Sequence, residues 1–259
     1  MELFGKTILI TGASTGIGKE LALRLAAQNN RLILLSRRLE LLNQIKDDAG
    51  NKNQQIDVFL CDVSDHEQVK TVFKSILDKH KTIDISILNS GVSFRNSIED
   101  FDASKAKKTF DINVMGVIYC IEQLLPMYMK EGRGIITGVS SLADARGFAK
   151  SGFYCASKAA LSIYLESLRS ELKPYGVKVI TIKPGFVKTP LTDKNEFKMP
   201  MLMSVNKAVD IIIAGLTKEK TIIQFPFLIS AVIKFVKLIP NNLFDYISIN
   251  HIKITGKKD

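Results

Sequence analysis

The stretch Thr7–Glu20, TILITGASTGIGKE, joins an apolar strand-like run to a helix-like run through Gly12, Gly16 and Gly18. Glycines at such a turn let the backbone bend sharply and approach a pyrophosphate closely. The first N–H groups and the positive dipole end of the following helix then attract that phosphate. The stretch therefore predicts a nucleotide site, and a purely structural turn is the alternative.

The spacing of these glycines excludes two better-known phosphate motifs. A phosphate-loop NTPase needs Gly-x-x-x-x-Gly-Lys-Ser/Thr, but Ala13 and Glu20 occupy its first and last positions. The Gly-x-Gly-x-x-Gly spacing is also absent, because the order here is Gly-x-x-x-Gly-x-Gly.

Outward from this stretch, short runs rich in Ile, Leu and Val alternate with segments of helical length. Strands that are continuously apolar are buried on both faces, as in a parallel sheet, and strand–helix alternation indicates βαβ units. We therefore predict an α/β fold, a Rossmann-type doubly wound parallel sheet with helices on both faces. The predicted strands are Lys6–Thr11, Arg31–Ser36, Ile56–Cys61, Ile83–Asn89, Gly134–Ser140 and Val177–Ile182, and the predicted helices are Ile17–Gln28, Glu67–Lys79, Ala103–Lys130 and Phe153–Lys173.

The length of 259 residues, with 46% hydrophobic residues, fits one α/β domain with a real core. We expect residues 1–192 to form a cofactor-binding and catalytic core. Residues 193–259 would add a substrate lid, the last helix and strand, and an apolar tail to the same domain.

Charge and cysteine content limit the partners and the compartment. The net charge is +10, but lysines are spread along the chain, which favours a solvated basic surface over a nucleic-acid site. The start of the chain lacks the features of a signal peptide, and Cys61, Cys120 and Cys155 have no metal-ligand spacing. We expect reduced thiols in the cytoplasm, and no metal, because the three histidines also lack ligand spacing.

The end of the second strand indicates which dinucleotide binds. A site for NAD usually carries an acidic residue here, but this strand ends in Ser36-Arg37-Arg38. A guanidinium can hold a 2′-phosphate through two N–H donors. The sequence therefore predicts a preference for NADP(H), and the start of a solvated helix is the alternative.

In order along the chain, these motifs resemble the short-chain dehydrogenase/reductase family over about residues 4–192. TGASTGIG resembles the family's cofactor turn, CDVSD its adenine contact, and LNSGV its Asn-Asn-Ala-Gly motif, with Ser90 where the family usually has alanine. YCASK and PGFVKTP resemble its catalytic and nicotinamide segments. The resemblance implies cofactor contacts by Gly12, Ser14, Thr15, Gly16, Ile17, Gly18, Ser36, Arg37, Arg38, Asp62, Val63, Asn89, Gly91, Tyr154, Lys158, Pro184, Gly185, Val187 and Thr189.

The same resemblance implies catalysis by Asn113, Ser141, Tyr154 and Lys158. Tyr154 and Lys158 are four residues apart and share a helix face, so the nearby ammonium, together with the positive ring of an oxidised nicotinamide, should lower the tyrosine pKa. Tyr154 would then act as general acid or base, and Lys158 would also bind the nicotinamide ribose. Ser141, thirteen residues before Tyr154, would bond the substrate carbonyl, whereas Ser140 would make a structural bond. Asn113, within a helix, would hold a water of a proton relay.

The tail departs from the family. Residues 191–203 resemble a substrate lid, and their methionines and Phe197 suit either an adaptable apolar surface or core packing. From Phe227 to Ile239, apolar residues cover most of a predicted helix, which is too short to span a bilayer. It could wall the pocket or form a subunit interface, and we rank both ahead of membrane contact through residues 225–239.

The leading hypothesis is an NADP(H)-dependent oxidoreductase acting on a carbonyl or secondary alcohol of a lipophilic substrate. The alternative is a catalytically silent NADP(H)-binding regulator or a membrane-peripheral scaffold on the same fold. The resemblance implies a homodimer or homotetramer, joined through the helices at Ala103–Lys130 and Phe153–Lys173.

Overall fold

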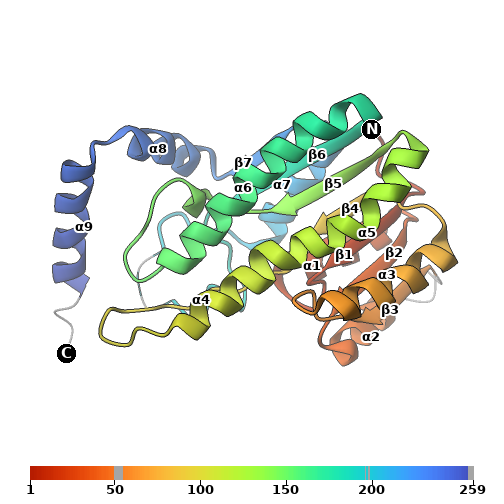
Figure 1. Cartoon of the computed structure of the whole chain (residues 1–259), viewed down its shortest axis with the longest axis horizontal. Helices are drawn as coiled ribbons and strands as arrows, with labels where there is room; N and C mark the ends of the chain where they lie inside the picture. Colours follow the sequence, from red (N-terminus) through yellow and green to blue (C-terminus); the bar gives the residue numbers. More distant parts are fainter. Residues whose placement is uncertain (50–54, 196, 198, 256–259) are drawn as a thin grey trace.

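Seven parallel strands form one sheet in the computed structural model, which describes residues 1–49, 55–195, 197 and 199–255 (Figure 1). The strand order is β3-β2-β1-β4-β5-β6-β7, so the order reverses between β1 and β4. The predicted Rossmann-type doubly wound sheet is confirmed. The strands are β1 (Thr7–Thr11), β2 (Arg31–Ser36), β3 (Ile56–Leu60), β4 (Ile85–Leu88), β5 (Gly134–Val139), β6 (Val177–Pro184) and β7 (Ile222–Phe225).

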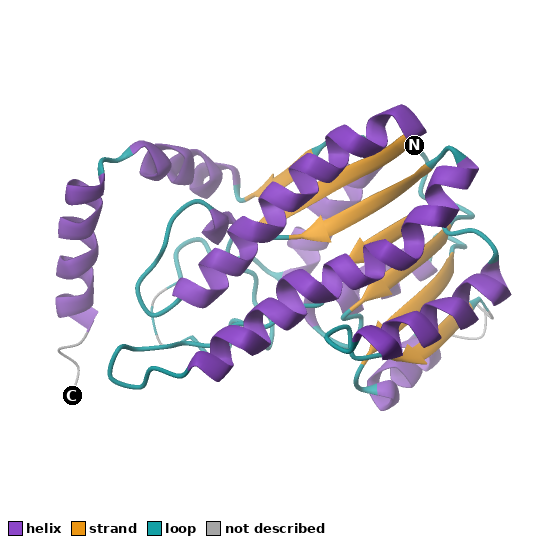
Figure 2. Ribbon diagram, in the orientation of Figure 1, coloured by secondary structure: helices purple, strands orange, loops and turns teal. Residues whose placement is uncertain are grey.

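Helices cover both faces of the sheet (Figure 2). Alternate side chains of each strand point to opposite faces, so Ile8 and Ile10 join one apolar core and Leu9 the other. The first face is covered by α1 (Gly16–Ala26), α2 (Leu39–Asp48) and α7 (Val205–Thr217), and the second by α3 (His66–His80), α5 (Gly116–Glu131) and α6 (Gly152–Leu172). A further helix, α4 (Ala103–Phe110), precedes α5 in the chain.

The predicted helix over Ala103–Lys130 contains a π-helical segment, η1 (Asp111–Met115), between α4 and α5. The N–H of Gly116 donates to the carbonyl of Asp111, one residue farther back than in an α-helix. Ala103–Glu131 is long and apolar enough to cross a membrane, but half of its most apolar window is buried in the fold. Its apolar residues are therefore explained by packing in the core of the fold.

The last third of the chain extends the sheet and then leaves it. A parallel bridge between Val187 and Met203 joins the two ends of the segment that contains the predicted lid. Within this lid, Glu196 and Lys198 lie outside the described residues. After α7 and β7, α8 (Phe227–Leu238) confirms the helix predicted from Phe227, and α9 (Asn241–Thr255) follows it. Both helices project from the carboxyl edge of the sheet (Figure 1). Residues 256–259 lie outside the described part of the chain.

Candidate active site

The turn after β1 lies against the end of β4, at the point where the strand order reverses. A Cβ on Gly12, whose φ is +63°, would lie 2.9 Å from the Cα of Ser90. The side-chain amide of Asn89 donates to the carbonyls of Thr11 and Gly12, at 3.2 and 3.1 Å. Asn89 therefore holds the glycine turn in place, and any side chain at Gly12 would force the two strand ends apart.

The other two glycines leave a bare cradle at the start of α1. A Cβ on Gly16 (φ +58°) would lie 3.1 Å from the Cγ2 of Thr189, and one on Gly18 only 2.4 Å from the carbonyl oxygen of Gly12. Ile17 lies between them in the first turn of α1, whose leading N–H groups have no partner within the helix. This cradle fits a dinucleotide pyrophosphate, and it brings Thr189 of the PGFVKTP segment beside the glycine turn.

The two arginines after β2 take different directions. Arg38 immediately precedes α2, and its Nη2 donates to the hydroxyls of Ser14 and Thr15, at 2.8 and 3.1 Å. Arg37 is 59% exposed and lies 3.6 Å from the carboxylate of Asp62. The guanidinium nearest the glycine turn is therefore that of Arg38, which the sequence did not separate from Arg37.

The remaining cofactor candidates near the adenine side are held by local contacts. The hydroxyl of Ser36 accepts the N–H of Arg38 at 3.0 Å, and the carboxylate of Asp62 accepts the N–H and hydroxyl of Ser64. Val63 is buried against Gly116 at the start of α5, where a Cβ would lie 2.7 Å from its Cγ2. The structure thus brings Asp62 and Arg37 to one edge of the sheet.

Asn113 lies in η1, fully buried, rather than in a regular α-helix. Its side-chain oxygen accepts the N–H of Val92 at 2.8 Å, and its amide donates to the Val92 carbonyl and to the Ser157 hydroxyl, each at 3.0 Å. A Cβ on Gly91 would touch both the Asn113 oxygen and the Lys158 ammonium. A π-helical segment at a functional site is common, and here it aims Asn113 at α6.

Tyr154, Ser141 and Lys158 converge where β5 and β6 end. The hydroxyl of Ser141 hydrogen-bonds Tyr154, accepts the N–H of Ala143 at 3.1 Å and donates to the Pro184 carbonyl at 3.4 Å. The Nζ of Lys158 donates to the carbonyl of Val139 at 2.8 Å and lies 5.7 Å from the ring centre of Tyr154. The helix-face prediction for Tyr154 and Lys158 is consistent with this placement.

The fold by itself does not lower the pKa of Tyr154, and the lowering expected beside an oxidised nicotinamide stays a prediction. Burial raises the pKa of Tyr154, and the hydrogen bond with Ser141 offsets only part of that rise. Lys158 does not counter it, because its ammonium bonds the Val139 carbonyl and burial lowers its own pKa to about 8. A neutral phenol can donate a proton, so this state suits a general acid.

Other predicted contacts lie along the segment after β6. The N–H of Gly185 donates to the carbonyl of Phe225 at 2.7 Å, which fixes Pro184 and Gly185 against the end of β7. Val187 is buried at the bridge to Met203. These residues hold the segment in position, and only Thr189 of this group reaches the glycine turn.

Sequence reasoning missed a polar network behind the catalytic helix. The Asp144 carboxylate accepts the Ser162 hydroxyl and the Lys183 ammonium, each at 2.6 Å. Ser162 also bonds Ser140 at 2.7 Å, and Ser140 lies 2.9 Å from the Lys158 carbonyl. The structural bond predicted for Ser140 is confirmed. The available signal for this network was an acid shortly after the predicted strand Gly134–Ser140 and a lysine directly after the predicted strand Val177–Ile182.

Thr11 and Ser157 were also missed. The hydroxyl of Thr11 accepts the N–H groups of Asn89 and Ser90, at 3.0 and 3.2 Å, and so ties β1 to the end of β4. Ser157 links Asn113 to α6, since its hydroxyl donates to the Tyr154 carbonyl at 2.8 Å. Both lie inside the recognised motifs, where a small hydroxyl next to a key residue was the only clue.

Comparison with known proteins matches residues 6–199 to the family model for short chain dehydrogenases. The chain belongs to the short-chain dehydrogenase/reductase family. It is therefore an oxidoreductase of alcohol and carbonyl groups. An uncharacterized oxidoreductase of Myxococcus xanthus is 34% identical over 94% of this chain and 96% of that protein. A fatty acyl-CoA reductase of Acinetobacter baylyi is 30% identical over 83% of this chain and 74% of its own.

Solved structures share the fold of this family member. A short-chain dehydrogenase/reductase of Burkholderia phymatum in complex with NAD superposes with a TM-score of 0.82 at 21% identity, over 90% of this chain and 93% of that one. A short chain dehydrogenase of Burkholderia cenocepacia in complex with NADP gives a TM-score of 0.78 at 24% identity, over the same shares. Neighbours of this fold thus bind either dinucleotide.

The buried ammonium of Lys158 generates a stability prediction. Its pKa in the fold, about 8, is below the ordinary 10.5, so the unfolded chain binds more protons between these values. Wild-type stability should therefore rise with pH across this window, and the cost of the buried charge is complete below about pH 8. We expect Lys158→Met to be more stable than wild type by about 1–3 kcal/mol at pH 7, and by much less at pH 10.

Urea unfolding at the two pH values measures this difference, and the exposed Lys130→Met serves as control, with a change near zero at both. A gain for Lys158→Met that does not depend on pH would contradict the assignment to the buried charge.

Proposed function

We propose that this chain is an NADP(H)-dependent oxidoreductase that interconverts a carbonyl and a secondary alcohol on a lipophilic substrate, with Tyr154 as general acid and base. The observation that carries the proposal is the convergence of Ser141, Tyr154 and Lys158 beside a bare glycine cradle. The alternative of a silent scaffold has no comparable observation in its favour.

Carbonyl reduction needs a hydride at carbon and a proton at oxygen, and the bound nicotinamide supplies the hydride. The chain's own residues deal with the proton. The Ser141 hydroxyl polarises the carbonyl oxygen, and the neutral phenol of Tyr154 donates its proton there. The resulting tyrosinate is stabilised by its hydrogen bond with Ser141, and Lys158 would bind the nicotinamide ribose. Alcohol oxidation follows the same path in reverse.

Replacing the phenol tests the catalytic part of the proposal. Tyr154→Phe removes the proton donor but keeps the ring, so we expect kcat to fall by about 10²–10⁴ with NADPH affinity within threefold of wild type. The measurement is NADPH oxidation with a panel of carbonyls, alongside fluorescence titration of NADPH. Tyr175→Phe, at a residue that is 46% exposed, is the matched control and should keep full activity.

No turnover by wild type with any carbonyl of the panel, with NADPH still bound, would favour the silent regulator. Equal turnover by wild type and Tyr154→Phe would remove Tyr154 from the proton transfer.

The preference for NADP(H) is supported by the absence of an acid at the end of β2 and by the two arginines there. Arg38 lies over Ser14 and Thr15 of the glycine turn, and Arg37 is exposed beside Asp62. Two cations on either side of the adenosine ribose region would favour a 2′-phosphate over a hydroxyl.

We expect NADPH to bind at least tenfold more tightly than NADH, by fluorescence titration. Arg37→Ala and Arg38→Ala should each reduce this ratio, and the double variant should abolish it, because the phosphate then lacks a cation. Arg31→Ala, at the opposite end of β2, should leave the ratio unchanged. Equal or tighter binding of NADH by wild type would show that Ser36-Arg37-Arg38 does not select the phosphate.

A lipophilic substrate is supported by the aromatic side chains around the catalytic residues. Phe153, next to Tyr154, makes an edge contact with Phe101, at 5.7 Å between ring centres. Phe186, after Gly185, contacts Phe197 of the lid in the same way at 5.8 Å. The similarity to a fatty acyl-CoA reductase points in the same direction.

A series of straight-chain carbonyls tests the substrate class. Each added methylene should raise kcat/KM by up to about fourfold until the apolar surface is covered, because burying a methylene contributes about 0.8 kcal/mol. Phe197→Ala should flatten this dependence without changing NADPH affinity. A preference for small polar sugars over the longer carbonyls would rule out the apolar site.

We also place the protein in the cytoplasm, as a homodimer or homotetramer joined through α5 and α6. The three cysteines are free and buried, which suits a reducing compartment. On α6, Ile163 is 70% exposed, as an apolar contact to a second subunit would require.

A further inference from the structure

Helices α8 and α9 expose an unusually apolar surface for their length. On α8, Phe227, Phe235 and Leu238 are 81%, 73% and 80% exposed. Among the side chains described on these two helices, the remaining exposed large hydrophobic residues are Leu228, Val232, Leu243, Tyr246, Ile247 and Ile249. We call this surface, including the three residues above, the arm face. A water-soluble chain rarely exposes so many large apolar side chains together unless they meet a partner.

The packing of α8 shows that its outward side is apolar as well as the side that faces the body. The side toward the body carries the buried Ser230 and the half-buried Ile229, Ile233 and Val236. Phe227, Leu228, Val232, Phe235 and Leu238 point outward instead. These side chains therefore do not wall an enclosed substrate pocket, which was one of the interpretations expected from the sequence.

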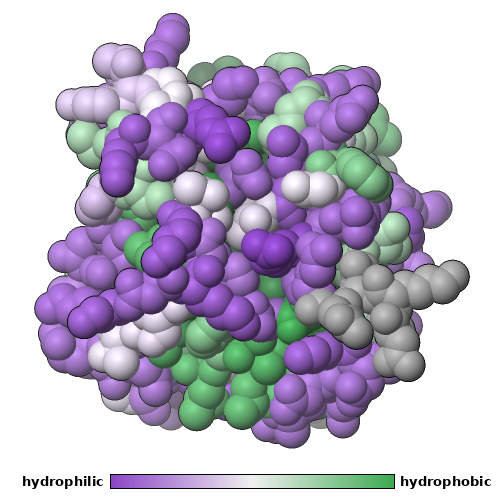
Figure 3. Space-filling view, turned by 90° about the vertical axis from the view of Figure 1, so that its right-hand side faces the viewer, coloured by the Kyte–Doolittle hydropathy of each residue, from purple (hydrophilic) through white to green (hydrophobic). Residues whose placement is uncertain are grey.

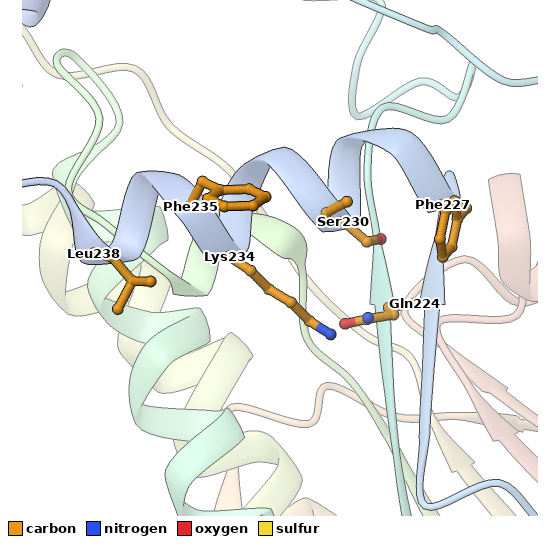
Figure 4. Close-up of a pocket in the computed structure, with 7 residues that line it drawn as sticks. Gln224, Phe227, Ser230, Lys234, Phe235 and Leu238 are labelled. Carbon is orange, nitrogen blue, oxygen red and sulfur yellow. The ribbon is translucent and has the colours of Figure 1, made fainter.

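A groove of about 320 Å³ runs along α8 and contains both apolar and cationic groups. Phe227, Ala231, Phe235 and Leu238 supply its apolar lining. Figure 4 shows the Lys234 ammonium and the Gln224 amide, from α8 and β7, pointing toward one another at one side. An amphiphile with an anionic head and an apolar chain matches this combination.

Charge distinguishes a bilayer from a second copy of the chain. α8 carries Lys234 and Lys237 and no acidic residue, and the sequence of α9 contains one acid, Asp245. Two copies that met through α8 would bring four lysines together without carboxylates from that helix to balance them. Anionic phospholipid headgroups supply the missing charge.

The opposite end of the molecule provides the contrast. The face seen in Figure 3, at the amino ends of the strands, is mainly hydrophilic, with an apolar area near its lower edge. The arm face lies at the other end, on helices that project from the sheet (Figure 1). A helix of 12 residues is about 18 Å long, too short to cross a bilayer core of about 30 Å. Such a helix can bind a bilayer only by lying in the plane of its interface, with the apolar side chains inward and the lysines at the headgroups.

We propose that the arm face docks on the surface of an anionic phospholipid bilayer, with Lys234 and Lys237 at the phosphates and the outward side chains of α8 and α9 among the upper acyl chains.

Helices α8 and α9, which we call the arm, also contact the loop between Ser141 and Tyr154. Arg146 donates to the carbonyl of Ile239 at 3.1 Å and to the side chain of Asn241 at 3.3 Å, and it stacks over Phe244. Phe148 contacts Phe244 edge-on. Arg146 and Phe148 lie between Ser141 and Tyr154 in the chain, so a docked arm would hold the site beside the bilayer. A site beside the bilayer is of use to the enzyme if the substrate is lipophilic, so this role rests on the proposed function. Docking of the arm face on the bilayer does not depend on the substrate.

Co-sedimentation of the full chain with vesicles tests the docking. We expect binding to phosphatidylglycerol-containing vesicles to exceed binding to pure phosphatidylcholine vesicles at least tenfold, and to weaken when NaCl rises from 50 to 500 mM. The triple variant Phe227→Glu, Phe235→Glu, Leu238→Glu should lose at least tenfold in binding. Phe4→Glu, at a residue that is 63% exposed outside the arm face, should bind like wild type.

A second variant, Lys234→Glu with Lys237→Glu, keeps the apolar side chains and should lose the preference for anionic vesicles. NADPH binding and turnover of a water-soluble carbonyl without vesicles show that each variant is folded, and they report on the proposed function separately from docking.

Two results would overturn the proposal. One is wild-type binding that is absent, or that is unchanged by the triple variant. The other is a wild type that does not bind vesicles and has a larger mass by light scattering than the triple variant. That result would assign the arm face to a second copy of the chain.

Discussion

The close contact between the turn after β1 and the end of β4 is the constraint on which the rest of the site depends. The hydroxyl of Thr11 and the amide of Asn89 bind the two strand ends together, and the bare Cα of Gly12 lets their backbones meet. This contact places the start of α1 beside the segment after β4, which in turn receives Asn113 through Val92. Cofactor cradle and catalytic helix are thus positioned by one junction at the strand-order reversal.

The parts of the fold that the sequence predicted are those with a strong local signal. The strands are continuously apolar because both faces are buried, so their existence and order could be read directly. The motif regions could be assigned because each combines residues at fixed spacing. By contrast, the π-helical turn at Asn113 depends on Val92 and Ser157, which are 21 and 44 residues away in the chain. The different contacts of the two arginines could not be predicted either. They depend on the direction of each guanidinium in the fold, Arg38 toward Ser14 and Arg37 toward Asp62.

The pKa values of Tyr154 and Lys158 could not be predicted from their spacing. Four residues on a helix put the two side chains on one face, but the sequence does not say what else the ammonium meets. In the fold it meets the carbonyl of Val139, and burial opposes charge on both groups. An uncharged phenol and a lysine of lowered pKa are the expected result when two ionisable groups share a poorly solvated site. Burial of the Lys158 ammonium costs stability. A binding site tolerates this cost because the ammonium can bind an anionic ligand.

Helices α8 and α9 contact the loop between the catalytic residues through Arg146 and Phe148. Arg146 belongs to the loop between Ser141 and Tyr154, yet its donors end on the junction between α8 and α9. The loop is fixed on its inner side by Asp144, which binds Ser162 and Lys183. A force on the arm would therefore act on the outer part of the loop while the network around Asp144 keeps Ser141 in place. This arrangement lets an apolar surface meet a partner without disturbing the catalytic hydroxyls, whereas an arm packed directly on Tyr154 would not.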